Sequence, residues 1–336
     1  MTADARSASA GPDPEDPLID KVNPDLRNPT NHRAEPNRSI RSKPPGHLIG
    51  LVGLGLVGTA LAQRLAAAGC QLLGFDRSDE ACAVWQQAGL GDRASCFAEI
   101  GQRCAAVVLA VFDTVGVLEV VEGTGGLLEG GVTRVFIDCS TGDPEALQAL
   151  AGRLAQRGVD FIEAPLSGSS QQIAQGAATM LLGGDEAALA RHQALLEVLS
   201  PQRVVVGGAG FGARAKLATN LVLGLNRAAF AEGLVLAQAL GIPSQVFLDL
   251  VLSSPARSEA AALKGPRMVL DDFTPQSRIR QHLKDLELML AAGRARGQEL
   301  PLTQTHAALL RGAVTAGDGD LDNAAVVRQI RRQRSL

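Results

Sequence analysis

A short apolar run that leads into three spaced glycines constrains this chain more than any other feature of its sequence. Residues 48–53 read LIGLVG, and glycine recurs at Gly55 and Gly58 to complete the pattern GxGxxG. Helix-like apolar spacing follows over residues 57–68. In a strand–turn–helix unit the first glycine permits a tight turn, the second lets backbone approach a pyrophosphate, and the third lets the helix pack on the strand. The pattern therefore predicts a dinucleotide-binding turn.

The residues that flank this turn indicate how it would bind the cofactor. Leu56 and Val57 begin the expected helix, whose N-terminal N–H groups and dipole favour a phosphate. Asp76 ends the next expected strand and follows Gly53 at close to the spacing of about 20 residues typical of an acid that binds ribose hydroxyls. Asp76 favours NAD, whereas the adjacent Arg77 could bind the 2′-phosphate of NADP. We expect NAD, and NADP remains open.

Strand-like and helix-like segments alternate along the chain after residue 47. Further apolar runs that read as strands occupy residues 72–75, 105–112, 135–138, 159–163, 178–182 and 204–206. Helical patterns separate them, and Asp143 followed by Pro144 provides an N-cap and a first helical residue. This alternation predicts an α/β fold with an N-terminal, doubly wound sheet of the Rossmann type.

The strand signals end at residue 208, and helical patterning takes over. Residues 212–240 predict one long helix of about 40 Å, which joins the sheet to an all-α C-terminal domain. Four prolines are expected to break the later helical pattern: Pro255, Pro266, Pro275 and Pro301. The predicted organisation is a disordered tail at residues 1–46, a dinucleotide-binding domain at residues 47–210, and a helical substrate and oligomerisation domain at residues 211–336.

The predicted tail differs from the remainder in composition. Eight of the 16 prolines lie between Pro12 and Pro45, among few apolar residues. Such a segment buries too little surface to offset the entropy of ordering it. It has no apolar core of a secretory signal, and its early acids disfavour a transit peptide. The sequence leaves open whether the tail is a solvated extension or a docking segment for a partner.

Charge and composition exclude several classes of protein. A net charge of −3 disfavours a nucleic-acid or membrane surface. No uninterrupted apolar stretch reaches 18 residues, so we expect no transmembrane helix. The five cysteines show no CxxC and the histidines no metal-ligand spacing, which predicts reduced thiols and no zinc site. These features favour a cytoplasmic protein.

Four further motifs follow the glycine turn. They are DCSTGDP at residues 138–144, EAPLSG at residues 163–168, Lys216 with Asn220 four residues beyond it, and KDL at residues 284–286. Together with the glycine turn, this set resembles the β-hydroxyacid dehydrogenase family, which includes 3-hydroxyisobutyrate dehydrogenase and tartronate semialdehyde reductase. The resemblance covers about residues 47–330.

The resemblance implies a role for each motif. The implied cofactor residues are Gly53, Gly55, Gly58, Thr141 and Lys284. The implied substrate residues are Ser140, Ser167 and Gly168, the last two at the substrate carboxylate. Lys216 matches the catalytic lysine, and Asn220 matches the asparagine that orients the substrate. The family's usual assembly implies a homodimer or a homotetramer.

The chemistry of Lys216 can also be argued from the residues alone. Hydride transfer to or from a hydroxyl-bearing carbon needs a general acid or base. Burial and nearby positive charge can lower the pKa of a lysine enough for this purpose. The chain has only five lysines against 27 arginines, and arginine cannot be deprotonated in a protein. On a helix, Lys216 and Asn220 share one face and could reach the same oxygen.

The chain departs from the family pattern near the predicted substrate. The family usually has Asp-Ala-Pro-Val where this chain has EAPL from Glu163, and a glycine at the position of Ser169; it often has a second asparagine where Leu221 follows Asn220. The Ser169 hydroxyl could enter the pocket and favour a short or hydroxylated substrate, or it could cap the turn formed with Ser170. We expect the first, which adds Ser169 to the predicted substrate residues.

The sequence therefore predicts an NAD(P)-dependent oxidoreductase that acts on a small β-hydroxy acid or its semialdehyde, with Lys216 as general acid or base. Two alternatives remain open. One is an NADPH-dependent imine reductase, which usually replaces the catalytic lysine. The other is a catalytically inactive NAD(P)-binding module whose tail recruits a partner.

Overall fold

A mostly parallel sheet forms the first half of the structure, a computed structural model that describes residues 48–333. The strands are β1 (Leu48–Val52), β2 (Gln71–Phe75), β3 (Asp92–Arg93), β4 (Ala106–Leu109), β5 (Val135–Asp138), β6 (Asp160–Glu163), β7 (Leu166–Ser167), β8 (Thr179–Gly183) and β9 (Arg203–Gly207). The predicted tail at residues 1–46 lies outside the described residues. The α/β fold with a Rossmann-type first half is confirmed.

The order of the strands places a crevice beside the glycine turn. The sheet runs β3-β2-β1-β4-β5-β6-β8-β7, and β9 pairs with β8. Strands β1 to β6 pair in parallel, whereas β8 runs antiparallel to β6 and β7. The chain leaves β1 toward β2 on one side and returns to β4 on the other. At such a switch point the connections diverge above the carboxyl ends of the strands, where ligands bind.

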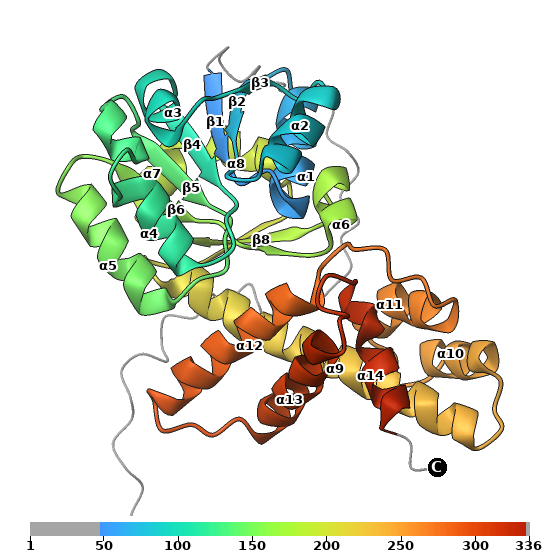
Figure 1. The fold of residues 1–336 in the computed structure, drawn as a ribbon. Coiled ribbons are helices and arrows are strands. Elements are labelled where there is room, and N and C mark those ends of the chain that lie inside the picture. The colour runs from blue at the N-terminus through green and yellow to red at the C-terminus, as the bar shows by residue number, and fades with distance from the viewer. Residues whose placement is uncertain (1–47, 334–336) are drawn as a thin grey trace, which may run out of the picture. The chain divides into compact units, whose positions relative to one another are not determined.

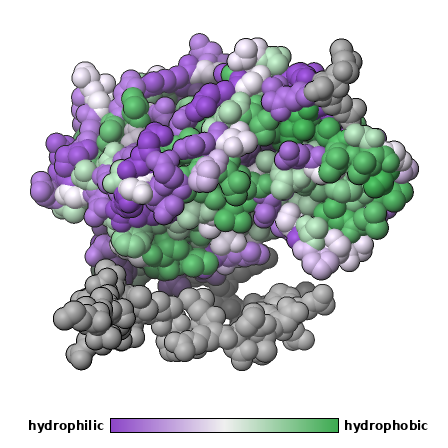
Figure 2. Space-filling view, turned by 90° about the horizontal axis from the view of Figure 1, so that it is seen from below, coloured by the Kyte–Doolittle hydropathy of each residue, from purple (hydrophilic) through white to green (hydrophobic). Residues whose placement is uncertain are grey.

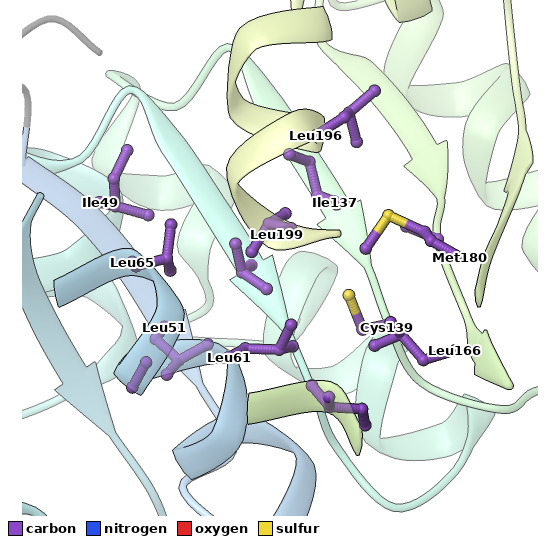
Figure 3. Close-up of a cluster of buried hydrophobic side chains, with 14 of the residues drawn as sticks. Ile49, Leu51, Leu61, Leu65, Ile137, Cys139, Leu166, Met180, Leu196 and Leu199 are labelled. Atoms are coloured by element: carbon purple, nitrogen blue, oxygen red, sulfur yellow. The ribbon is translucent and has the colours of Figure 1, made fainter. Parts of the chain in front are cut away.

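Helices cover both faces of the sheet (Figure 1). They are α1 (Leu56–Ala67), α2 (Asp79–Gln87), α3 (Phe97–Arg103), α4 (Thr114–Glu122), α5 (Pro144–Ala155), α6 (Ser170–Gln175), α7 (Glu186–Arg191) and α8 (Gln193–Leu199). Figure 3 shows Leu61 and Leu65 of α1 in one buried cluster with Ile137 of β5 and Leu199 of α8. This packing fixes α1, and with it the glycine turn, against the sheet.

The second half is helical, as predicted. It contains α9 (Phe211–Ala239), α10 (Ser244–Leu252), α11 (Glu259–Val269), α12 (Ile279–Arg294), α13 (Pro301–Thr315) and α14 (Val326–Arg332). The helix α9 contributes Ala213 to a hydrophobic core under the sheet and Leu217 to the core of the helical half. It therefore belongs to both cores.

Two details differ from the sequence-based expectations, and a third concerns the length of α9. Pro266 lies inside α11 and does not break it, so that expected break is wrong. The two-residue strands β3 and β7 were not predicted, because two residues carry no apolar period. By length and hydropathy alone α9 could cross a membrane, yet it carries buried Lys216 and Arg227. Those buried charges and its packing identify it as a core helix.

Candidate functional site

A cleft of about 1110 Å³ brings together most of the residues predicted from the sequence. The predicted residues that line it are Gly53, Gly55, Leu56, Val57, Asp76, Arg77, Ser140, Thr141, Ser167, Gly168, Ser169, Lys216 and Asn220. Gly58 and Lys284 do not line the cleft, but each contacts a residue that does: Gly58 packs against Gly53, and Lys284 donates a hydrogen bond to Thr141. The cleft is large enough for an extended cofactor beside a small substrate.

The three glycines of the turn are required for three different reasons. Gly53 has φ +92°, a left-handed conformation that favours glycine, and a Cβ there would overlap the carbonyl oxygen of Ala110. A Cβ at Gly58 would overlap the carbonyl oxygen of Gly53, so α1 packs directly on the turn. Gly55 instead faces open space. The bare backbone at Gly55 fits a dinucleotide pyrophosphate at the start of α1.

Asp76 is held at the edge of this turn by two backbone N–H groups. Its Oδ2 accepts a hydrogen bond from Leu54 N–H at 2.7 Å, and its Oδ1 accepts one from Ser78 N–H at 2.8 Å. The neighbouring Arg77 forms an ion pair of 2.6 Å with Glu119. The acid therefore lies at the turn, whereas much of the charge of Arg77 is already balanced by a carboxylate.

Lys284 joins the helical half to the loops that follow β4 and β5. Its Nζ donates to the carbonyl oxygen of Phe112 at 2.8 Å and to that of Thr141 at 2.6 Å. The preceding Ser140 accepts a hydrogen bond from Val111 N–H at 3.1 Å. One ammonium group thus holds together the two loops at the carboxyl ends of adjacent strands.

Two buried carboxyl groups lie side by side beneath these loops. Asp138 and Glu163 are register partners at the ends of β5 and β6, and each is 1% exposed. Glu163 Oε2 accepts hydrogen bonds from Gly210 N–H and Gly212 N–H, both at 2.9 Å. Burial raises the pKa of Asp138 to about 6 and that of Glu163 to about 7, where the Asp138 charge adds to the effect. Through these two bonds Glu163 anchors the N-terminus of α9.

From that anchor, α9 carries Lys216 into the cleft. Lys216 Nζ donates to the carbonyl oxygen of Leu166 at 2.5 Å and to Asn220 Oδ1 at 2.9 Å. Burial lowers the pKa of Lys216 to about 8; Asp285 opposes this shift and Lys284 adds to it. A lysine with this pKa can exchange a proton near neutral pH, as a general acid or base requires.

Asp285 completes the site and was not predicted from the sequence. Its Oδ2 accepts a hydrogen bond from Asn220 Nδ2 at 3.1 Å, and its Oδ1 lies 3.0 Å from Lys284 Nζ. The four side chains form a continuous line, Lys216–Asn220–Asp285–Lys284. The position of Asp285 beside Lys284 in the KDL motif was the available signal. A second unpredicted residue in the cleft is Arg227, which is 3% exposed.

Ser169 begins α6 through a capping box. Its Oγ accepts a hydrogen bond from Gln172 N–H at 3.3 Å, and its own N–H donates to Gln172 Oε1 at 2.8 Å. The hydroxyl oxygen therefore caps the helix, which is the alternative that we did not favour. The residue still lines the cleft, and its contact with a substrate stays a prediction.

Comparison with known proteins shows which families the chain resembles. The NAD binding domain of 6-phosphogluconate dehydrogenase matches residues 48–208, and the NAD-binding domain of NADP-dependent 3-hydroxyisobutyrate dehydrogenase matches residues 210–330. L-threonate dehydrogenase of Escherichia coli is 31% identical over 83% of this chain and 93% of its own length. Glyoxylate/succinic semialdehyde reductase 1 of Arabidopsis thaliana is 29% identical, over 85% and 99%.

A solved structure shows the same fold. The 3-hydroxyisobutyrate dehydrogenase from Salmonella typhimurium superposes with a TM-score of 0.75 at 28% identity, over 84% of this chain and 99% of that one. Together these matches define an NAD(P)-dependent oxidoreductase. The chain belongs to the 3-hydroxyisobutyrate dehydrogenase-like family of β-hydroxyacid dehydrogenases.

Proposed function

We propose that this enzyme interconverts a small β-hydroxy acid and its semialdehyde, with Lys216 as the general acid or base. The observation that carries the proposal is the buried Lys216 ammonium, 2.9 Å from Asn220 Oδ1 in the cleft that also contains the glycine turn. In oxidation the neutral amine takes the proton of the substrate hydroxyl. In reduction the ammonium donates that proton to the carbonyl oxygen.

The glycine turn and the loops after β4 and β5 would hold the cofactor. Gly53, Gly55 and the first N–H groups of α1, at Leu56 and Val57, would bind the pyrophosphate, and Gly58 would keep the helix close to the turn. Thr141 and Lys284 would lie on the nicotinamide side. Bound NAD(P) supplies the hydride acceptor or donor. The Asp76 carboxylate at the turn and the Arg77–Glu119 ion pair support a preference for NAD.

The substrate would lie between the capping turn of α6 and α9. Ser140, Ser167 and the backbone at Gly168 would hold its carboxylate, with Ser169 at the start of α6. Asn220 would fix the reacting oxygen next to Lys216. A lysine in this role disfavours the imine reductase alternative.

A substrate panel tests this proposal. Small hydroxy acids and semialdehydes are supplied with NAD(H) and NADP(H), and the change in reduced cofactor is followed by absorbance. We expect turnover of at least one hydroxy acid or semialdehyde, and faster turnover with NAD(H). Turnover of cyclic imines without turnover of any hydroxy acid or semialdehyde would contradict the proposal.

Exposed apolar side chains on the helical half support a homo-oligomer. Leu236 on α9 and Leu240 after it are 59% and 70% exposed, and Val246 and Leu250 on α10 are also exposed. Figure 2 shows hydrophobic areas on the face seen from below. We expect a homodimer or homotetramer in the cytoplasm. Light scattering should show Leu236→Glu as a smaller species than wild type, whereas Leu302→Glu on α13 serves as a matched control.

A further inference from the structure

Arg227 is a buried cation in the cleft that no described residue satisfies. It lies on α9, seven residues after Asn220, on the helix face that carries Lys216 and Asn220. The side chain is 3% exposed, and among the described residues its Nε and Nη2 have no hydrogen-bond partner. Leaving a buried guanidinium unpaired is strongly unfavourable. A partner outside the described protein atoms would remove that penalty.

The carboxylate that acts on Arg227 is already engaged by other groups. Asp322 attracts Arg227 electrostatically, but its Oδ1 and Oδ2 lie 2.9 and 3.0 Å from Lys264 Nζ. Its Oδ1 also accepts a hydrogen bond from Ala324 N–H, and its Oδ2 accepts bonds from Gln276 N–H and Ser277 N–H. Burial nevertheless lowers the pKa of Arg227 to about 10. Within residues 48–333, Asp322 attracts Arg227 but is not a hydrogen-bond partner of its Nε or Nη2.

Arg267 is a third cation beside Arg227 and Lys264, and it adds to the positive charge around Asp322. Arg267 Nη1 lies 3.4 Å from Asp322, and its Nη2 lies 3.2 Å from Asp272 at the edge of the cleft. Arg227, Lys264 and Arg267, which we call the cationic cluster, all line the cleft. The nearby His282 and His306 supply no negative charge, and burial lowers the pKa of both imidazoles, so they stay neutral. The cluster thus carries more positive charge than its carboxylates balance.

We propose that the cationic cluster, through Arg227, binds a second anionic group of the substrate, a carboxylate or a phosphate, at the end opposite the reacting carbon. The inference rests on the proposed function and narrows it to hydroxy acids or semialdehydes with two anionic groups. Guanidinium groups bind carboxylates and phosphates through charge-assisted, often bidentate, hydrogen bonds. The backbone positions of Lys216 and Arg227 are about 16 Å apart along α9, so several bonds separate the two ends of the substrate.

Matched substrates test the proposal by activity. Each monocarboxylic hydroxy acid is paired with one of equal length that carries a second terminal carboxylate or a phosphate ester. Wild type should have a higher kcat/KM for the dianion than for the monoanion. Comparison of the dicarboxylate with the phosphate ester shows which anionic group the site prefers. Arg227→Met should reduce the dianion-to-monoanion ratio of kcat/KM by about 10- to 100-fold, the scale of a lost charged hydrogen bond. Arg214→Met, an equal charge loss on the same helix, should leave the ratio within twofold of wild type.

A binding experiment separates this inference from the proposed function. Thermal shifts are measured with NADH alone and with added glutarate, phosphoglycolate or butyrate. Arg227→Met should raise the melting temperature of the unliganded protein, because it removes an unpaired buried charge. Glutarate or phosphoglycolate should stabilise wild type more than the variant, and butyrate should stabilise both equally.

Two results would overturn the proposal. One is an unchanged substrate ratio in Arg227→Met together with equal dianion-induced shifts. The other is destabilisation of the unliganded Arg227→Met variant, which would assign Arg227 a structural role. If wild type turns over neither substrate class, the proposed function fails, and the thermal shifts alone decide the role of Arg227.

Discussion

Burial lowers the pKa of Lys216, and the Asp285 carboxylate opposes that shift. Asp285 raises the pKa of Lys216 against the effect of burial, and the resulting pKa is about 8. Oxidation requires the neutral amine, so kcat for oxidation should rise with pH through about 8. Asp285→Asn removes the attraction and lowers that pKa, so the rise should move to lower pH. Full pH profiles of kcat for both proteins check this prediction. If kcat rises at the same pH in wild type and in Asp285→Asn, the prediction is wrong.

Removal of the amine itself should affect chemistry more than cofactor binding. Lys216→Ala should reduce kcat by about 10²–10⁴, the range for a lost acid or base. NADH should still bind, because the glycine turn is unchanged; fluorescence titration measures this. Thr219→Ala on the exposed side of α9 is the matched control. Near-normal kcat in Lys216→Ala would rule out the proposed role.

Asp76 should determine the choice of cofactor. We propose that its carboxylate would accept hydrogen bonds from ribose hydroxyls and would repel a 2′-phosphate, so kcat/KM should favour NAD over NADP. Asp76→Ser should narrow that difference. The same change removes the bond from Leu54 N–H at 2.7 Å, so the melting temperature should also fall. A tenfold preference of wild type for NADP would show that Arg77 dominates.

At the scale of elements, the junction between β6 and α9 should respond to pH. The pKa of Glu163 is raised to about 7 in the folded protein, so its contribution to stability is full at low pH and is lost as pH rises through about 7. Glu163→Gln keeps an acceptor for Gly210 N–H and Gly212 N–H and carries no charge. Its melting temperature relative to wild type should be higher at pH 8 than at pH 5.

An exposed acid provides the control for that comparison. Glu186→Gln on α7 removes a carboxylate that lies at the surface. Its melting temperature relative to wild type should be nearly the same at pH 5 and pH 8. If the melting temperatures of the two variants relative to wild type change equally between pH 5 and pH 8, the cause is the overall charge and not the buried pair of Asp138 and Glu163.

The elements that the sequence predicted correctly are those with a local signal. Buried parallel strands give continuous apolar runs, and the Asp143-Pro144 start of α5 is visible in two adjacent residues. The glycine turn and the Lys216–Asn220 pair are local in the same sense. Asp285 reaches Asn220 across 65 residues, so only the tertiary fold brings them together. Arg227 was missed because an arginine on a helix is usually solvated.

At the scale of the whole molecule, α9 makes the two halves interdependent. Ala213 packs under the sheet, Leu217 packs in the helical core, and Lys216 lies between them in sequence. Gly212 also donates to the buried Glu163. A cut at the predicted boundary of residue 210 would therefore expose the apolar surface around Ala213 on α9 and leave the Glu163 carboxyl group without its Gly212 partner. The domain boundary at residue 210 stays a prediction.

The position of α9 in the chain also determines the order in which the parts of the site are synthesised. A ribosome synthesises the glycine turn and the strands of the sheet before it adds Asp285, which completes the line of side chains from Lys216 to Lys284. Asp285 emerges 65 residues after its partner Asn220. At about 5–20 residues per second, this interval lasts several seconds. During that time Lys216 and Asn220 are already in the nascent chain, but the carboxylate that opposes the effect of burial on the pKa of Lys216 is not.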